Sequence, residues 1–324
     1  MTAPHATFWV HRVWRDWRRE IMRGAFLFLV VASVGVFFLR QVKAFEPLSL
    51  LRDHGFDPDA VADSDRNWVD AFTWSGVVAS GGPVWVRNLN GAIVVEPADG
   101  DSVVITAQKS WSHGDPESVR VVTVPSDGGV TVCALWSAVT SECGAGGVYH
   151  MKGGKGHHGD VAVRFFVRVP RGVRLDASTV NGGLTASGTT APLVLETVNG
   201  GVAVLDASGA VSAATVNGSI TATVLSLTNV EELDLRTVNG SIQASVPASI
   251  NALLEASTVN GKVNTDLPIQ LIGRVNPRHL RATIGTGGAP LRLKTVNGSV
   301  TLTPGGVPEP VDAPPPAEPV MVRQ

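Results

Sequence analysis

One tetrapeptide, Thr-Val-Asn-Gly, occurs six times in the second half of this chain. The copies contain the pairs Asn181 and Gly182, Asn199 and Gly200, Asn217 and Gly218, Asn239 and Gly240, Asn260 and Gly261, and Asn297 and Gly298. Successive Asn residues are separated by 18, 18, 22, 21 and 37 residues. A period of this length is typical of solenoids, in which each repeat is a coil that buries its apolar face only against its neighbours. The sequence therefore predicts a solenoid.

The segments on either side of each Asn-Gly pair have the pattern of β-strands. In the second copy, residues 192–198 lead in and residues 201–205 lead out, and both are rich in aliphatic residues and too short for helices. Before Asn-Gly the apolar residues Leu193 and Leu195 fall on odd positions, whereas Val202 and Val204 fall on even positions. A strand face changes parity only at a bend or bulge, so we expect one here, and Asn-Gly tolerates the positive φ that a bend or bulge often needs.

Asn-Gly is also the commonest hairpin turn, which leaves a stack of antiparallel hairpins as an alternative. Near-equal spacing with identical phase favours parallel coils, because stacking then places each Asn above the previous one and allows a ladder of side-chain amides. On this interpretation Asn217 lies in a middle coil and Asn297 lies near the end of the ladder.

These repeats resemble the "putative adhesin" domains of unknown function, also called toast-rack domains, which carry repeated T-V-N-G-x-I units. The likeness extends over residues 72–303, and it includes Phe72-Thr-Trp-Ser-Gly, the segment from Val84 to Ile93, and the segment from Val163 to Pro170. The resemblance implies an all-β fold and, through the family's name, a role in adhesion.

The N-terminus predicts attachment to a membrane. Residues 8–23 place Trp and aliphatic side chains at helical spacing with arginines between them, as in a helix on the cytoplasmic membrane surface. Residues 24–39 form an apolar run that spans roughly 24 Å as a helix, and Arg23 and Arg40 can snorkel to extend it. Five arginines precede the run, so the N-terminus is expected to stay inside. The segment Val42-Lys-Ala44 has small residues at the spacing that signal peptidase recognises. Cleavage after Ala44, followed by secretion, is therefore the alternative.

The predicted fold class is all-β: a single-stranded parallel β-helix or β-solenoid with an N-terminal β cap region, preceded by one transmembrane or signal helix. The predicted parts are a cytoplasmic amphipathic leader (1–23), a transmembrane or signal-anchor helix (24–39), a linker (40–66), the β cap region (67–174), the repeat solenoid (175–303) and a Pro-rich disordered tail (304–324). The repeats are then extracytoplasmic, in the periplasm or at the surface of a bacterial envelope, and anchored in the inner (cytoplasmic) membrane unless the leader is cleaved.

Cys133 and Cys143 are the only cysteines and have nine residues between them. In an oxidising compartment two such cysteines are expected to form one disulfide, in agreement with the predicted export.

The sequence predicts no catalytic residue, no cofactor and no metal. His150, His157, His158 and Asp160 lie in a Gly-rich loop, where side chains rarely hold the fixed geometry of a metal site. The ionisable groups of residues 175–303 are few and scattered, whereas general acid and base catalysis needs them to converge. Trp74, Trp85, Trp111 and Trp136 are interpreted as core or cap residues rather than as a sugar-stacking surface.

The leading functional hypothesis is a non-enzymatic, membrane-tethered recognition module that binds an unknown protein or polysaccharide of the envelope. The alternative is a self-assembling, bactofilin-like β-helical scaffold, and a β-helix enzyme that acts on polysaccharides is the third reading. A net charge of -2 without a basic stripe gives no reason to expect a nucleic-acid partner.

Overall fold

The computed structural model describes residues 67–137, 140–152, 160–227, 231–272 and 276–305. The predicted leader, apolar helix and linker, and almost all of the tail, lie outside these residues. Within the described ranges no helix is long and apolar enough to cross a membrane.

The described residues form an all-β arrangement with two large sheets and one small one. Sheet A has the order β1 (Val69–Val77), β4 (Ser102–Ser110), β9 (Ala162–Val169), β3 (Ile93–Pro97), β11 (Leu184–Ser187), β13 (Val202–Ser208), β15 (Ile220–Ser226), β17 (Ile242–Val246), β23 (Val300–Pro304), β19 (Val263–Thr265). Sheet B has the order β20 (Ile269–Leu271), β21 (His279–Ile284), β18 (Ala252–Ser257), β22 (Ala289–Lys294), β16 (Leu233–Asn239), β14 (Val211–Asn217), β12 (Leu193–Glu196), β10 (Arg174–Ser178), β2 (Pro83–Arg87), β6 (Gly129–Trp136), β5 (Val119–Ser126). The small sheet pairs β7 (Thr140–Cys143) with β8 (Tyr149–Lys152), and the 3-10 turns are η1 (Pro116–Ser118) and η2 (Ala145–Gly147).

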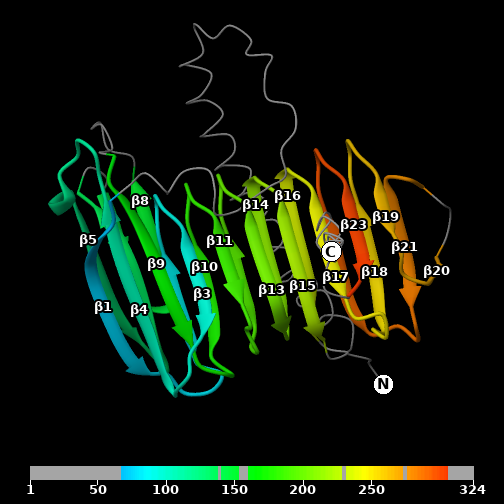
Figure 1. Ribbon diagram of the computed structural model, residues 1–324, viewed down its shortest axis with the longest axis horizontal. Helices are drawn as coiled ribbons and strands as arrows, with labels where there is room; N and C mark the ends of the chain where they lie inside the picture. The colour runs from blue at the N-terminus through cyan, green and yellow to red at the C-terminus, as the bar shows by residue number, and fades with distance from the viewer. Residues whose placement is uncertain (1–66, 138–139, 153–159, 228–230, 273–275, 306–324) are drawn as a thin grey trace, which may run out of the picture. The chain divides into compact units, whose positions relative to one another are not determined.

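Each repeat is one coil with a strand in each large sheet. The chain runs along β12 in sheet B, turns at Asn199, and continues along β13 in sheet A, and the next coils repeat this path with β14 and β15 and then with β16 and β17. Strands of neighbouring coils pair in parallel in both sheets. The parallel-coil prediction is therefore correct, and the Asn-Gly pairs are corners between sheets rather than hairpin turns (Figure 1).

The hydrophobic core lies between the two sheets. Leu193 and Leu195 point inward from β12, and Val202 and Val204 point inward from β13, each with about 1% or less of its surface exposed. Thr197 is the last buried residue before the corner and Val202 is the first after it. The four residues between them shift the inward positions from odd to even, which is the physical cause of the parity change in the sequence.

The parallel stack begins before the first full Thr-Val-Asn-Gly copy. β2 pairs in parallel with β10, β3 pairs in parallel with β11, and Asn90 forms a bridge with Asn181. Residues 83–97 thus form a first coil, although their corner reads Asn-Leu-Asn-Gly. Beyond this coil, antiparallel pairing of β4 with β9 and β1, and of β5 with β6, covers the end of the stack.

The order of the last two coils corrects the sequence-based expectation. The coil of β22 and β23, which contains Asn297, lies between the coil of β16 and β17 and the coil of β18 and β19. Asn260 therefore occupies the end of the ladder and Asn297 an interior position. The long interval between these two Asn residues contains the antiparallel hairpin of β20 and β21, which covers β18 (Figure 1). The chain then crosses back into the stack.

Candidate functional site

The threonines of the six corners are buried and bind the neighbouring coil. Each is 4–6% exposed, and each hydroxyl donates to the carbonyl oxygen of a corner glycine in the adjacent coil. The pairs are Thr179 with Gly91, Thr197 with Gly182, Thr215 with Gly200, Thr237 with Gly218, Thr295 with Gly240 and Thr258 with Gly298, at 2.7–3.1 Å. A buried hydroxyl needs such a partner, so the threonines hold coils together rather than contact a ligand.

The asparagines form the predicted amide ladder along the exposed corner. Each Nδ2 donates to the Oδ1 of the next residue, from Asn260 through Asn297, Asn239, Asn217 and Asn199 to Asn181, over distances of 2.7–2.8 Å. All these hydrogen bonds run in one direction along the stack. At the opposite end, Asn90 donates to the backbone carbonyl of Val161 instead.

The corner glycines are needed for contact rather than for a positive φ. Gly182, Gly200, Gly218, Gly240 and Gly261 are not among the described residues with positive φ, and Gly298, at 152°, is the one copy that is. A Cβ on any of these six glycines would approach the glycine carbonyl of the adjacent coil more closely than the 3.0 Å that Cβ atoms keep from their neighbours. The positive φ that Asn-Gly tolerates therefore occurs at only one of these six glycines.

The ladder leads to a prediction about Asn217, Asn297 and Asn260. Replacing Asn217 or Asn297 by Asp removes one donated amide bond and places a carboxylate beside the carbonyl oxygen of the next Asn. Both residues also accept a bond from the coil on the other side, whereas no described Asn donates to Asn260. A carboxylate still accepts that bond, so each of these variants loses only the bond that its amide donates. We expect Asn217→Asp, Asn297→Asp and Asn260→Asp to lower the free energy of unfolding by similar amounts, and each by about 1 kcal/mol more than Asn181→Asp, because Asn181 donates to no described Asn.

Urea denaturation of the four variants at neutral pH tests this order. A mild effect of Asn297→Asp, matching that of Asn181→Asp, would contradict the donation from Asn297 to Asn239 inside the stack.

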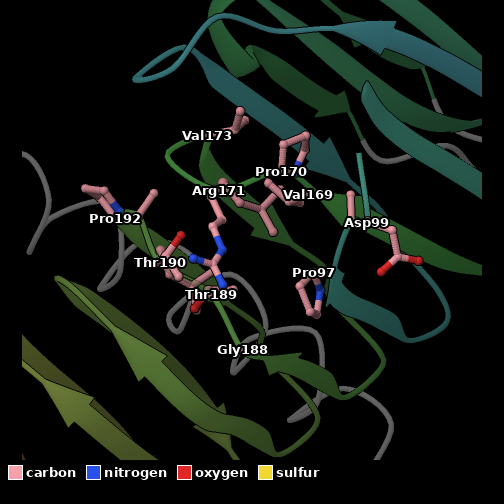
Figure 2. Close-up of a pocket in the computed structure, with 14 residues that line it drawn as sticks. Pro97, Asp99, Val169, Pro170, Arg171, Val173, Gly188, Thr189, Thr190 and Pro192 are labelled. Atoms are coloured by element: carbon pink, nitrogen blue, oxygen red, sulfur yellow. The ribbon is translucent and has the colours of Figure 1, made fainter. Parts of the chain in front are cut away.

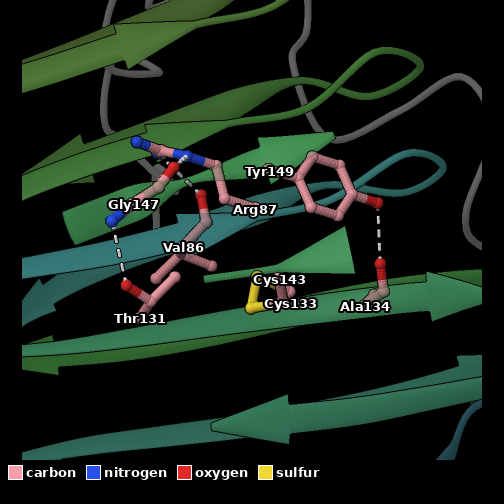
Figure 3. Close-up of a disulfide and its surroundings, with 8 residues drawn as sticks. All are labelled: Val86, Arg87, Thr131, Cys133, Ala134, Cys143, Gly147 and Tyr149. Atoms are coloured by element: carbon pink, nitrogen blue, oxygen red, sulfur yellow. Dashed lines mark hydrogen bonds between the residues drawn. A yellow bond between two sulfur atoms is a disulfide. The ribbon is translucent and has the colours of Figure 1, made fainter. Parts of the chain in front are cut away.

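The structure confirms the expected disulfide between Cys133 and Cys143. It joins β6 of sheet B to the last residue of β7, in the small hairpin of β7 and β8 (Figure 3). Tyr149, on β8, donates its hydroxyl to the carbonyl of Ala134 at 2.7 Å, and burial raises the pKa of the phenol. The disulfide and this hydrogen bond together hold the hairpin against β6.

Residues of η2 lie over the outer face of sheet B near its N-terminal end. Gly147 donates to the hydroxyl of Thr131 at 3.0 Å and accepts from Nε of Arg87 at 3.0 Å (Figure 3). Arg87 also pairs with Asp176 at 2.8 Å, and its side chain is only 11% exposed. The segment therefore covers this part of the sheet as a cap.

The four tryptophans singled out in the sequence do not form one surface. Trp136 is 3% exposed, and Trp74 packs against the core. Trp85 is on β2, where a Cβ on Gly147 would collide with its ring, so η2 lies directly over it. Trp111 is 37% exposed. This distribution agrees with their interpretation as core and cap residues.

Asp160 ties two parts of the cap together. Its carboxylate accepts backbone N–H bonds from Ser112, His113 and Gly114 at 2.7, 2.9 and 2.6 Å. The bond from His113, with those from the other two amides, lowers the pKa of Asp160 to about 2. His157 and His158 lie outside the described residues, and the described part of the chain contains no cluster of His, Cys, Asp or Glu able to hold a metal.

The depressed pKa of Asp160 predicts a dependence of stability on acid. A carboxylate whose pKa is lower in the folded state contributes stability above its unfolded pKa, near 4, and this contribution is lost as the pH falls toward 2. We expect Asp160→Asn to lose less stability than the wild type between these pH values. Melting temperatures at pH 5, 4, 3 and 2.5 provide the comparison. Asp101→Asn, which removes the same charge from an exposed turn, is the control and should follow the wild type.

The outer face of sheet B is charged, and several of its charged side chains are paired with one another. Lys294 and Arg281 both pair with Glu255, at 3.3 and 3.4 Å, and these contacts lower the pKa of Glu255 against the opposing effect of burial. Arg236 pairs with Asp234, and Arg292 pairs with Glu232. Arg281 and Lys294 lie on the two strands that flank β18, whereas Asp234 and Arg236 lie two residues apart on β16. The carboxylates named here are therefore engaged with cations rather than gathered into an acid and base pair.

The outer face of sheet A has a different chemistry. From β11 to β23 its outward rows carry small hydroxyl, amide and aliphatic side chains: Thr185, Ser187, Ala203, Leu205, Thr221, Thr223, Gln243, Ser245, Thr301 and Thr303. Asp206, at a bulge in β13, is the single ionisable residue in these five strands. The face is therefore regular and almost uncharged.

Comparison with known proteins agrees with this architecture. Residues 154–303 match the family model described as Toastrack DUF4097. This part of the chain is similar to the Toastrack family. This result confirms the family resemblance that the Thr-Val-Asn-Gly repeats indicated.

Solved structures similar to this chain share little of its sequence. A putative cell adhesion protein from Clostridium sporogenes is 12% identical with a TM-score of 0.39, over 72% of this chain and 99% of the other. A putative adhesin from Bacteroides fragilis is 10% identical with a TM-score of 0.28, over 77% of this chain and 100% of the other. No curated protein matches the chain.

Proposed function

We propose that this protein is a non-enzymatic, extracytoplasmic recognition module of the adhesin type, in which the outer face of sheet A binds a protein or polysaccharide of the cell envelope. The observation that carries the proposal is the difference between the two faces. Sheet B carries charged side chains on its outer face, several of them paired with one another, whereas sheet A presents rows of hydroxyl and amide groups over five strands.

A face of this kind suits an extended, weakly charged partner. Strands in a sheet lie about 4.8 Å apart, so equivalent side chains recur at that interval along the stack. Thr221, Gln243 and Thr301 are neighbours in one such row. Regular donors and acceptors on a rigid surface can bind a partner whose own polar groups repeat, without first ordering flexible loops.

In this proposal the N-terminal segment tethers the protein to the membrane, and the Toastrack-like domain lies outside the cytoplasm. The disulfide supports this location, because disulfides persist in oxidising compartments. Protease treatment of intact cells or spheroplasts, followed by blotting for the full chain, tests the location. Complete protection until the inner membrane is opened would contradict it.

The test of the binding face uses charge. Thr221→Lys with Gln243→Lys places two cations in the middle of the sheet A face, and we expect this variant to lose retention of isolated envelope polysaccharide or purified surface protein. Ser212→Lys places a cation on the outer face of sheet B, at a strand next to β16, and should retain it. Equal retention by both variants would show that sheet A is not the binding face.

The scaffold alternative requires ends that pair with another molecule. Antiparallel strands cover the N-terminal end of the stack, and β20 and β21 cover β18 at the other end. At the edge of sheet A, Val263 donates its N–H to the carbonyl of Pro277, which partly covers β19. These features favour a recognition module over a filament. Light scattering and negative-stain microscopy of the purified chain test this preference, and concentration-dependent filaments would reverse it.

A further inference from the structure

A cavity of about 390 Å³ lies at the edge of the stack where strands β3, β9 and β11 of sheet A end (Figure 2). Three loops line it: residues 97–99 after β3, residues 169–173 between β9 and β10, and residues 188–192 between β11 and β12. Pro97, Pro170 and Pro192 each contribute to its wall. Because a proline ring fixes φ, these loops are stiffer than their lack of regular structure suggests. The cavity is of a size that takes a small organic group.

A tight turn places Arg171 at this cavity. The N–H of Val173 donates to the carbonyl of Pro170 at 3.3 Å, and Gly172 has a φ of 80°. Pro170 is the first residue of this turn and Gly172 is the third. A positive φ at the third position is typical of a type II turn, which needs glycine there. The carbonyl of Gly172 accepts a bond from the N–H of Gly81 at 2.7 Å, which fixes the turn to a neighbouring loop. Arg171 thus extends from an anchored backbone.

The guanidinium of Arg171 has no hydrogen-bond or ion-pair partner among the described residues. This contrasts with Arg87, Arg236 and Arg281, which all pair with carboxylates. Figure 2 shows the Arg171 side chain extending toward Thr189 and Thr190 of the facing loop. A cation beside two hydroxyl groups, over walls of proline and aliphatic carbon, is a favourable setting for an oxyanion.

We propose that this cavity binds a carboxylate group, held by Arg171 with hydroxyl contacts from Thr189 and Thr190. Asp99 also lines the cavity, and its negative charge opposes a second negative charge on the ligand. A singly charged carboxylate is therefore favoured over a phosphate that carries nearly two charges. The carboxylate can belong to a uronic acid sugar or to the C-terminus of a peptide, which present the same chemistry to the arginine.

Isothermal titration calorimetry on the full chain tests the site with two matched pairs of probes. One pair is trigalacturonate and its methyl ester, and the other is N-acetylated trialanine with a free C-terminus and its C-terminal amide. We expect one carboxylate probe to bind and its neutral partner not to bind. The pair that responds identifies the source of the carboxylate.

Arg171→Gln should weaken this binding by about tenfold or more, since hydrogen bonds to charged groups contribute at least this much. Arg168→Gln is the matched control: it removes the same charge three residues earlier, where the side chain is 64% exposed and faces Glu96 at 3.9 Å. Its affinity should equal that of the wild type. A second readout is labelling of Arg171 by phenylglyoxal, measured by peptide mass spectrometry, which bound probe should suppress.

Any of four results would overturn the proposal: no binding of either carboxylate probe, equal binding of the neutral partners, unchanged affinity in Arg171→Gln, or an equal loss in Arg168→Gln. Melting temperatures of both variants establish that they are folded. The site lies at the loop edge rather than on the outer face of sheet A. A lack of carboxylate binding would therefore not contradict the proposed recognition function, which the lysine variants of sheet A test separately.

Discussion

Gly182→Ala is expected to destabilise the protein by about 3 kcal/mol, at the upper end of the cost of overpacking. A Cβ at this position would overlap the backbone carbonyl of Gly91 in the adjacent coil. Backbone in the middle of a stack cannot move away alone, because the same strands are hydrogen-bonded to the coils on both sides. The methyl group must therefore separate two coils or distort the corner. The acceptor of the Thr197 hydroxyl, the Gly182 carbonyl, would shift as well.

Gly183→Ala is the matched control one residue away. A Cβ on Gly183 would lie 3.5 Å from the carbonyl oxygen of Gly201, an ordinary van der Waals distance. The same coil position holds Ser219, Ser241 and Ser299 in other repeats. We expect this variant to stay within about 1 kcal/mol of the wild type or to gain a little from reduced entropy of the unfolded chain. Chemical denaturation of both variants measures the difference. Equal stabilities would show that carbonyl contact does not explain the repeated glycine.

The repeats allowed the parallel coils, the inward aliphatic rows and the amide ladder to be predicted, because each follows from period and parity alone. The role of glycine was not accessible in the same way. Asn-Gly is associated with positive φ in general. Gly182 is needed instead because the backbone of Gly91 in the adjacent coil lies so close to it. These two residues are distant in sequence, so the contact could not be predicted from the repeat.

The order of coils was inaccessible for a related reason. Residues 237–241 and 295–299 have the same sequence, Thr-Val-Asn-Gly-Ser, so either stacks equally well on a third copy. Nothing local marks the coil of Asn297 as the one that enters the stack between two earlier coils. The carboxylate pocket was equally hidden, because its loops are separated along the chain and only folding brings Arg171 to face Thr189.

Deleting residues 289–324 is expected to release the coil of β18 and β19 while coils as far as β17 remain folded. In a solenoid built in sequence order, loss of the last repeat shortens the stack by its terminal coil. Here it removes β22 and β23 from the interior of both sheets. The buried side chains lost include Leu291, Leu293 and Leu302, and burial of a leucine contributes about 1.5–3 kcal/mol. The coil beyond them loses its parallel neighbours.

Hydrogen exchange read by mass spectrometry distinguishes this result from simple shortening. Amides of residues 252–284 should lose protection in the deletion variant, whereas those of residues 202–224 should keep it, because stability in a stack is largely a sum of contacts between neighbours. Deletion of residues 306–324 alone is the control and should leave both segments protected. The opposite result also has a physical basis. Without the coil of β22 and β23, Thr258 and Asn260 could stack directly on the coil of Asn239 and Gly240, which carries the same motif. Protection of residues 252–265 at the wild-type level would show that the coil of β18 and β19 stacks directly on the coil of β16 and β17. It would also show that the coil of β18 and β19 does not need the coil of β22 and β23.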